Sequence, residues 1–476
     1  MKYDNRMKDK RAEDKRIDNK MKSGKRIWSI FFVICVLILG QYISEEEFGK
    51  CITKAGVGES NIVTNLNRKV SAKTKKVCTV NGAVELDDTD VKIKYNGKNI
   101  GSAKTPIVEY QGMYMIAFEP MLSKKGPGIS FEHNLRNAHT TLIWQDHVVT
   151  FFTEDRVMYA SGQMVGMDVP IMEGQFQETG KTYLLAPMEP LCQALGFTCS
   201  WNEKKTVYMI KSEKEVITAA KTQTPYAYSK KDYVAKQYRR YSAVSPSEYR
   251  RLVSKSGDTT KGFQFLRLDE YREVDEHRFK EYYQYLIEDY CRQNNLAYTK
   301  SKLYKKADIF LKAAKKYNID PVYFVCQTFQ ESAYGTSRLA RGVTIQRVAY
   351  KNFSMSGGKL KTKALSSKVK VYNLYGIKAY DTDPVVGATS YAYYQGWTSV
   401  NAAIYGAAQY LTENYIAGKY KQNTLFKMRY TYRKALWHQY AMDPYYAANI
   451  GIRIYYMRCC YAEESKLTFD YPKYNG

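Results

Sequence analysis

One carboxylate closes a nearly wholly apolar helical stretch. Residues 321–330 read PVYFVCQTFQ, and Glu331 follows directly, just before the polar, glycine-containing segment SAYGTS. Asp320 and Pro321 are typical of a helix start, because aspartate accepts hydrogen bonds at the N-cap and proline needs no N–H donor in the first turn. Burial raises the pKa of such a carboxyl group, so that it stays protonated near neutral pH. This suits a general acid; the alternative is a carboxylate that only caps the helix or forms a salt bridge.

The elements that position Glu331 are predicted to be helices. Residues 308–317 repeat apolar side chains every three to four positions, which predicts a helix directly before the one that Glu331 closes. The helical pattern starts near residue 263 and continues through the stretches VNAAIYGAAQYLTENYI and YYAANIGIRIYYM, with a loop-rich stretch over residues 341–370. We therefore expect a mainly α C-terminal domain over residues 261–470.

Composition narrows the classes of partner. The chain has 476 residues, 45% of them hydrophobic, which predicts two or three domains with their own cores. It carries 73 Lys and Arg against 47 Asp and Glu, a formal net charge of +26. This balance favours a polyanion: nucleic acid, anionic lipid or an anionic cell-wall polymer. The nine cysteines lack metal-site spacing, and His133, His139 and His147 form no convincing metal set, so we expect neither a metal nor another cofactor.

An apolar segment without charges at residues 27–43, IWSIFFVICVLILGQYI, follows a tail, residues 1–26, with eleven Lys or Arg and five Asp or Glu. Its length is at the short end for a membrane span. The positive-inside rule puts the tail in the cytoplasm and everything after about residue 44 outside, which removes nucleic acid as the expected partner. The rival interpretation, a cleaved signal peptide, lacks a small-x-small cleavage site. We expect an uncleaved transmembrane signal anchor that leaves the other domains in the cell wall.

Residues 76–212 predict a β-rich α+β domain, since short alternating runs such as VKIKY, VVTFF and TVYMI are separated by Gly, Asn and Asp. Residues 113–151 and 182–210 repeat one pattern: a strand, an EPM or EPL turn that opens a short helix, a Gly break and two strands. The repeat resembles the non-catalytic copper amine oxidase N-terminal-like module of bacterial surface proteins, which implies a spacer or a wall- or partner-binding unit. Residues 44–75 are interpreted as a stalk, and residues 213–260 as a basic, tyrosine-rich linker with some helix.

The C-terminal domain resembles a known family along most of its length. From about residue 263 to residue 462 it is similar to the glucosaminidase domain of bacterial bifunctional autolysins, within glycoside hydrolase family 73. The segments that carry the resemblance are FLRLDEY (265–271), AAKKYNIDPVYFVCQTFQESAYGTSRLARG (313–342), VYNLYGIKAYDTDP (371–384), GATSYAYYQGW (387–397), YIAGKYKQNTLFKMRY (415–430) and WHQYAMDP (437–444). The resemblance implies a lysozyme-like α fold with a small loop-rich or hairpin lobe that walls a cleft. It also implies cleavage of the β-1,4 bond after N-acetylglucosamine in peptidoglycan.

The resemblance assigns roles to single residues. Glu331 stands where the family has its general acid, and Tyr440 aligns with a tyrosine thought to support the transition state; the alternative for Tyr440 is a core tyrosine. Ala333 replaces a family glycine after Glu331, and Tyr430 replaces a usual tryptophan. The substrate-binding positions implied within the shared segments are Gln422, Asn423, Tyr430, His438, Gln439 and Asp443. Tyr375 is a further candidate, because amphipathic rings suit sugar faces; the alternative is that its ring packs in the core.

The second catalytic group is left open by the sequence. Between Ser332 and Tyr380 there are ten Lys or Arg and no Asp or Glu, so the expected small lobe offers no carboxylate. Asp381 and Asp383 are the next candidates for a base or nucleophile; alternatively they cap a helix or shape a turn. In a third alternative the 2-acetamido group of the sugar supplies the nucleophile and no second carboxylate is needed. We favour this substrate assistance.

These features predict a membrane-anchored endo-β-N-acetylglucosaminidase with peptidoglycan glycan strands as substrate and anionic wall polymers as further partners. The alternatives are a non-catalytic wall-binding protein on the same fold, or a muramidase or lytic transglycosylase. Bond choice depends on the shape of the subsites, which the sequence does not show.

Overall fold

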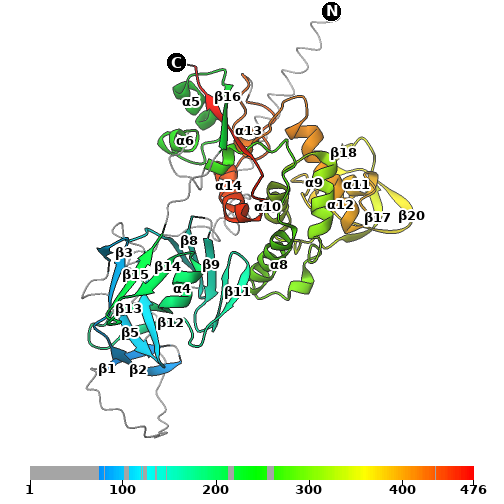
Figure 1. Cartoon of the computed structure of the whole chain (residues 1–476). Coiled ribbons are helices and arrows are strands. Elements are labelled where there is room, and N and C mark those ends of the chain that lie inside the picture. The colour runs from blue at the N-terminus through cyan, green and yellow to red at the C-terminus, as the bar shows by residue number, and fades with distance from the viewer. Residues whose placement is uncertain are drawn as a thin grey trace, which may run out of the picture. The chain divides into compact units, whose positions relative to one another are not determined.

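The structure is a computed structural model, and two regions of different secondary structure follow one another in it, a β-rich region and a helical domain (Figure 1). It describes residues 74–475 apart from 80, 101–106, 119–120, 122–125, 135–136, 146, 213–218, 255–261 and 435. The predicted cytoplasmic tail, the predicted transmembrane segment 27–43 and nearly all of the predicted stalk therefore lie outside the described residues. Within the described part, no helix is both long and apolar enough to cross a membrane.

The β-rich region combines three sheets. A closed barrel has the strand order β1 (Thr74–Thr79), β12 (Met172–Phe176), β13 (Thr182–Pro187), β6 (Met113–Ala117), β5 (Ile107–Tyr110) and β2 (Gly82–Asp88). A five-stranded sheet has the order β11 (Gln163–Gly166), β10 (Val157–Ala160), β9 (His147–Phe152), β8 (His139–Trp144) and β7 (Ser130–Asn134). A four-stranded sheet has the order β14 (Thr198–Trp201), β15 (Val207–Lys211), β3 (Lys92–Tyr95) and β4 (Lys98–Asn99).

One apolar core connects these sheets. It joins Ile116 of the barrel, Leu142 of the five-stranded sheet and Tyr208 of the four-stranded sheet, with Leu191 from helix α4 (Met188–Ala194) between them. The first strands of the two predicted repeats, β6 and β13, pair with each other in antiparallel register. The prediction of a β-rich region is thus confirmed.

The C-terminal domain is helical around one buried helix. Its helices are α8 (Glu276–Gln293), α9 (Ala307–Tyr317), α10 (Pro321–Ser332), α11 (Pro384–Tyr394), α12 (Val400–Leu411), α13 (Leu425–Arg429) and α14 (Tyr446–Tyr456). Helix α10 is buried along almost its whole length and packs against α9 and α14 (Figure 1). The predicted helix that Glu331 closes is thus confirmed, and its burial fits its apolar sequence, because a helix that is apolar on all faces is stable only when they are covered.

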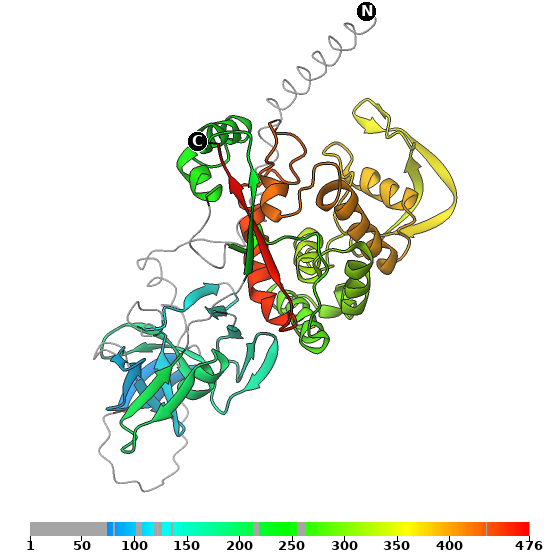
Figure 2. The ribbon, with the colours of Figure 1, turned by 45° about the horizontal axis from the view of Figure 1, so that its top comes forward.

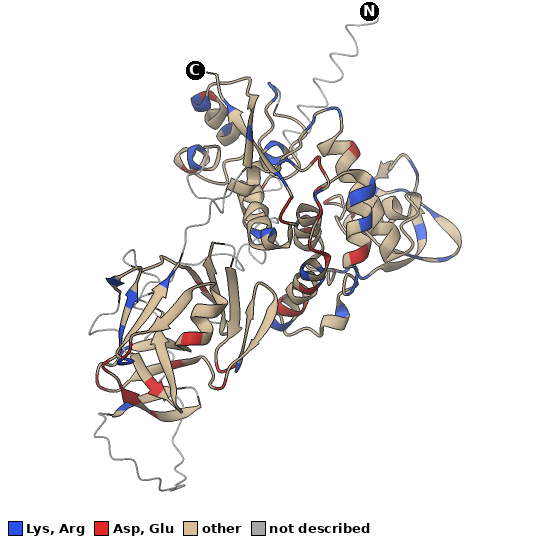
Figure 3. Ribbon diagram, viewed as in Figure 1, with Lys and Arg blue, Asp and Glu red and all other residues tan. Residues whose placement is uncertain are grey.

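A β-hairpin replaces the predicted loop-rich stretch. Strands β17 (Val343–Ala349) and β20 (Thr362–Val371) pair in antiparallel register, and β18 (Met355–Ser356) and β19 (Lys359–Leu360) form its tip. The hairpin projects from the helices beside α11 (Figure 2). The hairpin contains several Lys and Arg residues and no Asp or Glu (Figure 3).

The structure corrects the predicted linker. Within residues 213–260, strand β16 (Ala219–Pro225) pairs in parallel with β21 (Leu467–Lys473), which comes from the C-terminal end of the chain (Figure 2). The helices α5 (Lys230–Arg240) and α6 (Pro246–Leu252) follow β16 in the sequence. Tyrosines rather than aliphatic residues anchor this segment: Tyr226, Tyr233 and Tyr249 are fully buried in the same core as α10. The helical domain therefore begins near residue 219 and extends to residue 473.

Candidate active site

A buried ionic network anchors the start of α10. The Asp320 side chain caps the helix by accepting a hydrogen bond from the Tyr323 backbone N–H at 2.8 Å. It also accepts one from Arg272 Nη1 at 2.9 Å and one from the Tyr461 hydroxyl at 2.9 Å. Asp320 is fully buried, and each of its oxygens has a donor, which is the condition under which a buried charge is tolerated. The first turn of α10 is thereby fixed to two distant segments of the domain.

The end of α10 has a strained turn. Ala333 and Tyr334 have φ angles of 49° and 52°, in the left-handed region, where a residue with a Cβ atom pays about 1–2 kcal/mol. Ala333 stands where the family that the domain resembles has glycine. The turn is therefore kept, but the Cβ atom of alanine makes it less stable than it would be with glycine. The Ser332 hydroxyl stabilises it, since it donates to the Thr328 carbonyl at 2.6 Å and accepts from the Gly335 N–H at 2.9 Å.

Two donors converge on one oxygen of Glu331. Gln327 Nε2 donates to Glu331 Oε1 at 2.9 Å, and the Tyr440 hydroxyl donates to the same oxygen at 3.0 Å. The Tyr446 hydroxyl donates to Gln327 Oε1 at 2.8 Å, which orients the amide so that its nitrogen faces Glu331. Within the described part of the chain, Oε2 has no donor. The carboxyl proton is therefore expected on Oε2.

The pKa of Glu331 is raised to about 7 from its ordinary value of 4.5, and burial is the cause. The hydrogen bonds from Tyr440 and Gln327 act in the opposite direction, because they stabilise the carboxylate. No acidic side chain among the described residues contributes to the shift. The desolvation expected from the sequence is thus present, and it favours the protonated form of Glu331 near neutral pH.

Tyr440 is held in a row of aromatic rings. Its ring stacks on Tyr446 at 5.1 Å between centroids and meets Tyr415 edge-on at 5.0 Å. Tyr415 in turn lies 4.7 Å from the His438 ring. These contacts fix the position of the ring, and the hydroxyl donates to Glu331. Tyr440 therefore packs like a core tyrosine and also contacts the candidate acid.

Two residues predicted to bind substrate are structural. Gln422 is fully buried; its Nε2 donates to the backbone carbonyls of Lys427 and His438, and its Oε1 lies 2.8 Å from His438 Nδ1. Tyr430 is 1% exposed and donates to the Pro444 carbonyl. Neither side chain can touch a sugar, because each points into the core and uses its polar groups there. These two assignments are therefore corrected.

Three further predicted residues are half-buried and engaged with the protein. Asn423 donates to Asp269 Oδ2 at 2.8 Å, and Gln439 donates to the Arg429 carbonyl at 2.6 Å. Asp443 accepts from the Tyr445 N–H at 2.9 Å.

His438 is half-buried between Tyr415 and Tyr420, and burial lowers its pKa, so it is neutral at pH 7. The two segments KQNTLFKMR and HQY are joined at Tyr440, whose backbone N–H donates to the Met428 carbonyl at 2.8 Å.

The site also contains residues that sequence reasoning missed or left uncertain. Gln327 and Tyr446 were not predicted, although Gln327 lies four residues before Glu331 on the same helix, a spacing that brings side chains together. Tyr375, which was predicted, lies near the site: its hydroxyl is 2.8 Å from Thr328 Oγ1, and the charge of Glu331 contributes to its raised pKa after burial.

Asp381 and Asp383 lie apart from this constellation. Asp381 is exposed, and Asp383 occupies the N-cap position of α11 without a side-chain capping bond. No hydrogen bond joins either to Glu331 in the part of the chain that the structure describes. Among the described residues, the groups hydrogen-bonded to Glu331 are thus an amide and a tyrosine hydroxyl, and no second carboxylate.

A helix that ends on a desolvated carboxylic acid is an arrangement by which glycoside hydrolases protonate a leaving oxygen. Residues 307–457 match the family model Glucosaminidase, described as mannosyl-glycoprotein endo-beta-N-acetylglucosaminidase. This match lies within the helical domain and agrees with the predicted resemblance of that domain to glucosaminidase domains. The resemblance of residues 76–212 to a copper amine oxidase N-terminal-like module stays a prediction.

Two curated proteins and one solved structure are similar to part of this chain. The bifunctional autolysin of Staphylococcus epidermidis is 33% identical over 199 residues, which are 42% of this chain and 13% of that protein. The bifunctional autolysin of Staphylococcus aureus is 33% identical over 220 residues, which are 46% of this chain and 15% of that protein. The crystal structure of S. aureus glucosaminidase B aligns with 55% of this chain and 97% of its own, at 24% identity and a TM-score of 0.38. The chain thus spans a small part of the two autolysins.

Proposed function

We propose that this chain is a peptidoglycan hydrolase that cleaves the β-1,4 bond after N-acetylglucosamine, an endo-β-N-acetylglucosaminidase with Glu331 as general acid. One observation carries the proposal: Glu331, with its pKa raised to about 7, accepts a 3.0 Å hydrogen bond from Tyr440 within a glucosaminidase domain. A protonated carboxylic acid near neutral pH is the group that a sugar leaving oxygen needs.

The acid step follows from the two oxygens of Glu331. Oε1 is occupied by Gln327 and Tyr440, so Oε2 carries the proton and gives it to the glycosidic oxygen as the bond to C1 breaks. The carboxylate that forms is stabilised by the same two donors. Since those donors are already in place before the reaction, no reorganisation is needed when the charge develops.

The nucleophile is proposed to come from the substrate. The carbonyl oxygen of the 2-acetamido group attacks C1 on the face opposite to the leaving group and forms an oxazolinium ring, which water then opens, with Glu331 as base. A carboxylate close to Glu331 would raise its pKa by charge repulsion, and the shift at Glu331 has no such contribution from the described residues.

Replacing Asp381 or Asp383 by asparagine is expected to leave most of the activity. Neither side chain is bonded to Glu331, and an asparagine keeps the size of each residue. Turnover of purified peptidoglycan should stay within about threefold of wild type, and a thiazoline that mimics the oxazoline should inhibit. Substrate assistance would be ruled out by two results together: an Asp381 or Asp383 variant that loses as much activity as Glu331→Gln, and a wild-type enzyme that the thiazoline does not inhibit.

The activity is expected to decline as the pH rises through about 7. The acid works only when protonated, and its pKa is raised above its ordinary value, so the protonated fraction falls on the alkaline side of that value. The measurement is kcat/KM on solubilised glycan strands from about pH 5 to pH 9. A rate that stayed constant over this range would show that Glu331 is not the proton donor.

The bond that is cleaved can be read from the products. Purified peptidoglycan is digested with the full chain, reduced and analysed by mass. A fragment starting at residue 261 is unsuitable, because it would lack β16 and the buried tyrosines of α5 and α6. Reduced N-acetylglucosamine ends support the proposal, whereas reduced muramic ends indicate a muramidase and anhydro-muramic ends a lytic transglycosylase. Binding without any product indicates a wall-binding protein.

We also propose that residues 27–43 anchor the chain in the cytoplasmic membrane and that residues after about 44 lie outside in the cell wall. The support is the apolar segment without charges and the basic tail on its N-terminal side. The β-rich region would then act as a spacer or a wall-binding unit, as its resemblance to a copper amine oxidase N-terminal-like module implies. Protease treatment of intact cells tests this topology: the tail should be protected and the helical domain digested.

A further inference from the structure

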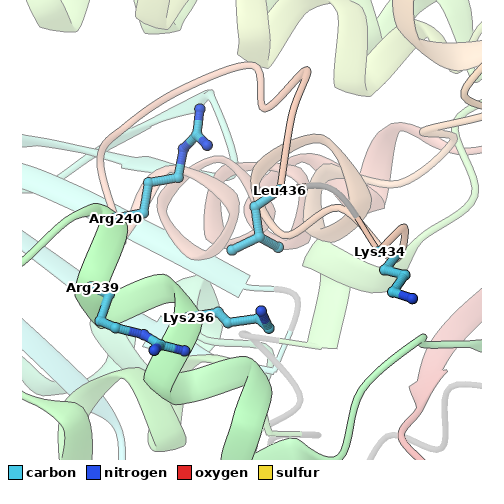
Figure 4. A pocket seen from close by; sticks show the side chains of 5 residues that line it. All are labelled: Lys236, Arg239, Arg240, Lys434 and Leu436. Atoms are coloured by element: carbon cyan, nitrogen blue, oxygen red, sulfur yellow. The ribbon is translucent and has the colours of Figure 1, made fainter. Parts of the chain in front are cut away.

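A pocket of about 390 Å³ on the helical domain is lined by four cations and one apolar residue, namely Lys236, Arg239, Arg240, Lys434 and Leu436. Two segments far apart in the sequence build it. The first three cations come from the last two turns of α5, and the other two residues come from the segment before Trp437. Figure 4 shows Leu436 between the α5 side chains and Lys434. The α5 side of the pocket belongs to the segment predicted to be a linker, whereas Lys434 and Leu436 belong to the C-terminal part of the chain.

The four cations, which we call the cationic pocket, have no ion pair with any acidic residue that the structure describes. By contrast, Arg251 on the next helix pairs with Glu248. Arg239 and Arg240 lie in the last turn of α5, where the helix dipole favours positive charge. The dipole does not explain why Lys434, which is in another segment, also lies at this pocket. Four like charges around one hollow repel one another unless an anion enters.

Aromatic contacts hold two of these cations in place. Lys236 Nζ lies 4.7 Å from the centre of the Tyr228 ring. Arg240 Nε donates to the Tyr241 hydroxyl at 3.0 Å. Less conformational entropy is lost on binding when side chains are already positioned, so the hollow is suited to a ligand.

A second, larger pocket of about 750 Å³ adjoins the first and shares Lys434 with it. Tyr420, Tyr432 and Trp437 are among its lining residues, and Trp437 is 58% exposed with its ring 5.3 Å from that of Tyr420. Exposed aromatic faces of this kind suit the faces of sugar rings, because each ring is apolar across its face and polar at its edge.

Ring contacts connect this aromatic pocket with the catalytic acid. Trp437 lies 5.1 Å from His438, which lies 4.7 Å from Tyr415, which lies 5.0 Å from Tyr440. Tyr440 donates to Glu331. The aromatic pocket and the catalytic acid are therefore linked by one set of packed rings within the helical domain.

We propose that the cationic pocket is a subsite for an anionic group, a phosphate or a carboxylate, carried by the glycan strand at a distance from the cleaved bond. The aromatic pocket holds the sugars between that group and Glu331. Wall glycan offers two sources of such anions: the carboxylates of its peptides and the phosphates of polymers attached to it. The inference rests on the proposed function and adds a preference for strands that carry these anions.

Binding without turnover tests the subsite. The full chain carrying Glu331→Gln is sedimented with three insoluble walls: intact, freed of phosphate polymers by hydrofluoric acid, and freed of peptides by an amidase. The same measurement is made after adding Arg239→Ala and Arg240→Ala together. Lys230→Ala with Lys231→Ala is the matched control, because it removes the same charge from the first turn of the same helix.

The pocket variant should bind intact wall about tenfold more weakly, and the control should stay within about twofold. The treated wall on which this difference disappears identifies the source of the anion. Equal binding by the pocket variant and the control on all three walls would overturn the proposal. An equally large loss of binding in the control would also overturn it, because it would show that the overall positive charge, and not this pocket, attracts the wall. Hydrolysis of bare glycan by the same double variants with Glu331 intact is measured separately, so a failure of the proposed function is seen independently.

Discussion

Glu331→Gln is expected to reduce the hydrolysis of peptidoglycan about 10²–10⁴-fold, the range that general acid catalysis contributes. The amide keeps the size of the side chain, and its oxygen can still accept from Gln327 and Tyr440. It lacks the proton that the leaving oxygen requires. Release of reducing ends from purified peptidoglycan measures the loss, and a variant that kept more than about a tenth of the wild-type rate would show that Glu331 is not the acid.

Stability measurements distinguish this loss from unfolding. The pKa of Glu331 is raised in the folded chain, so its protonation contributes stability below the ordinary value of 4.5, and this contribution is lost as the pH rises through about 7. The glutamine variant has no such dependence. Its Tm relative to wild type should therefore be higher at pH 8 than at pH 4. Glu413→Gln is the matched control, since Glu413 is exposed and its Oε1 accepts from Gln409, a neighbour one turn away on the same stretch of helix; both its activity and its Tm should stay near wild type.

Tyr440→Phe is expected to reduce kcat about 10–100-fold, because a hydrogen bond to a charged group is worth about 1.5–3 kcal/mol. Phenylalanine keeps the ring contacts with Tyr446 and Tyr415 and removes only the hydroxyl that donates to Glu331. That bond stabilises the carboxylate and lowers the pKa, so its loss raises the pKa of Glu331 further. The alkaline limb of the pH–rate profile should move to higher pH.

Tyr445→Phe provides the comparison for Tyr440→Phe. The Tyr445 hydroxyl also donates to a carboxylate, Glu248 Oε1 at 2.9 Å, but Glu248 pairs with Arg251 outside the site. Loss of the Tyr445 hydroxyl should change neither kcat nor the position of the alkaline limb of the pH–rate profile. A decline in kcat for Tyr440→Phe with an unshifted limb would mean that the hydroxyl acts on the substrate directly and not through Glu331.

Local patterns predicted much of the fold. The N-cap pair Asp320-Pro321, the apolar run after it and the terminal Glu331 sit in α10 as expected, because capping and apolar periodicity act within one helix. The same reasoning failed for residues 213–260. There the core positions are Tyr226, Tyr233 and Tyr249, whose hydroxyls make the segment look polar although the rings are buried. Backbone carbonyls satisfy these hydroxyls: Tyr226 donates to Tyr430 and Tyr233 to Thr431.

Shared segments located the site but did not show which side chains face it. Tyr440 and Gln422 both lie in segments that carry the family resemblance, yet only Tyr440 reaches the acid, whereas Gln422 is turned inward to hold the backbone of His438. The spacing of four residues places Gln327 beside Glu331, but only the contact with Tyr446 shows that the amide nitrogen faces the acid.

By itself, the sequence determined that a lone acid ends an apolar helix, that a β-rich region precedes a helical domain and that an apolar segment follows a basic tail. Each of these depends on residues close together in the chain. Only the tertiary structure decided that Tyr440, 109 residues after Glu331, donates to it, and that α5 and the segment around Lys434 bring four cations to one pocket. The physical reason is that capping and periodicity act over a few residues, whereas the direction of a side chain and its distance from a remote partner depend on how the helices pack.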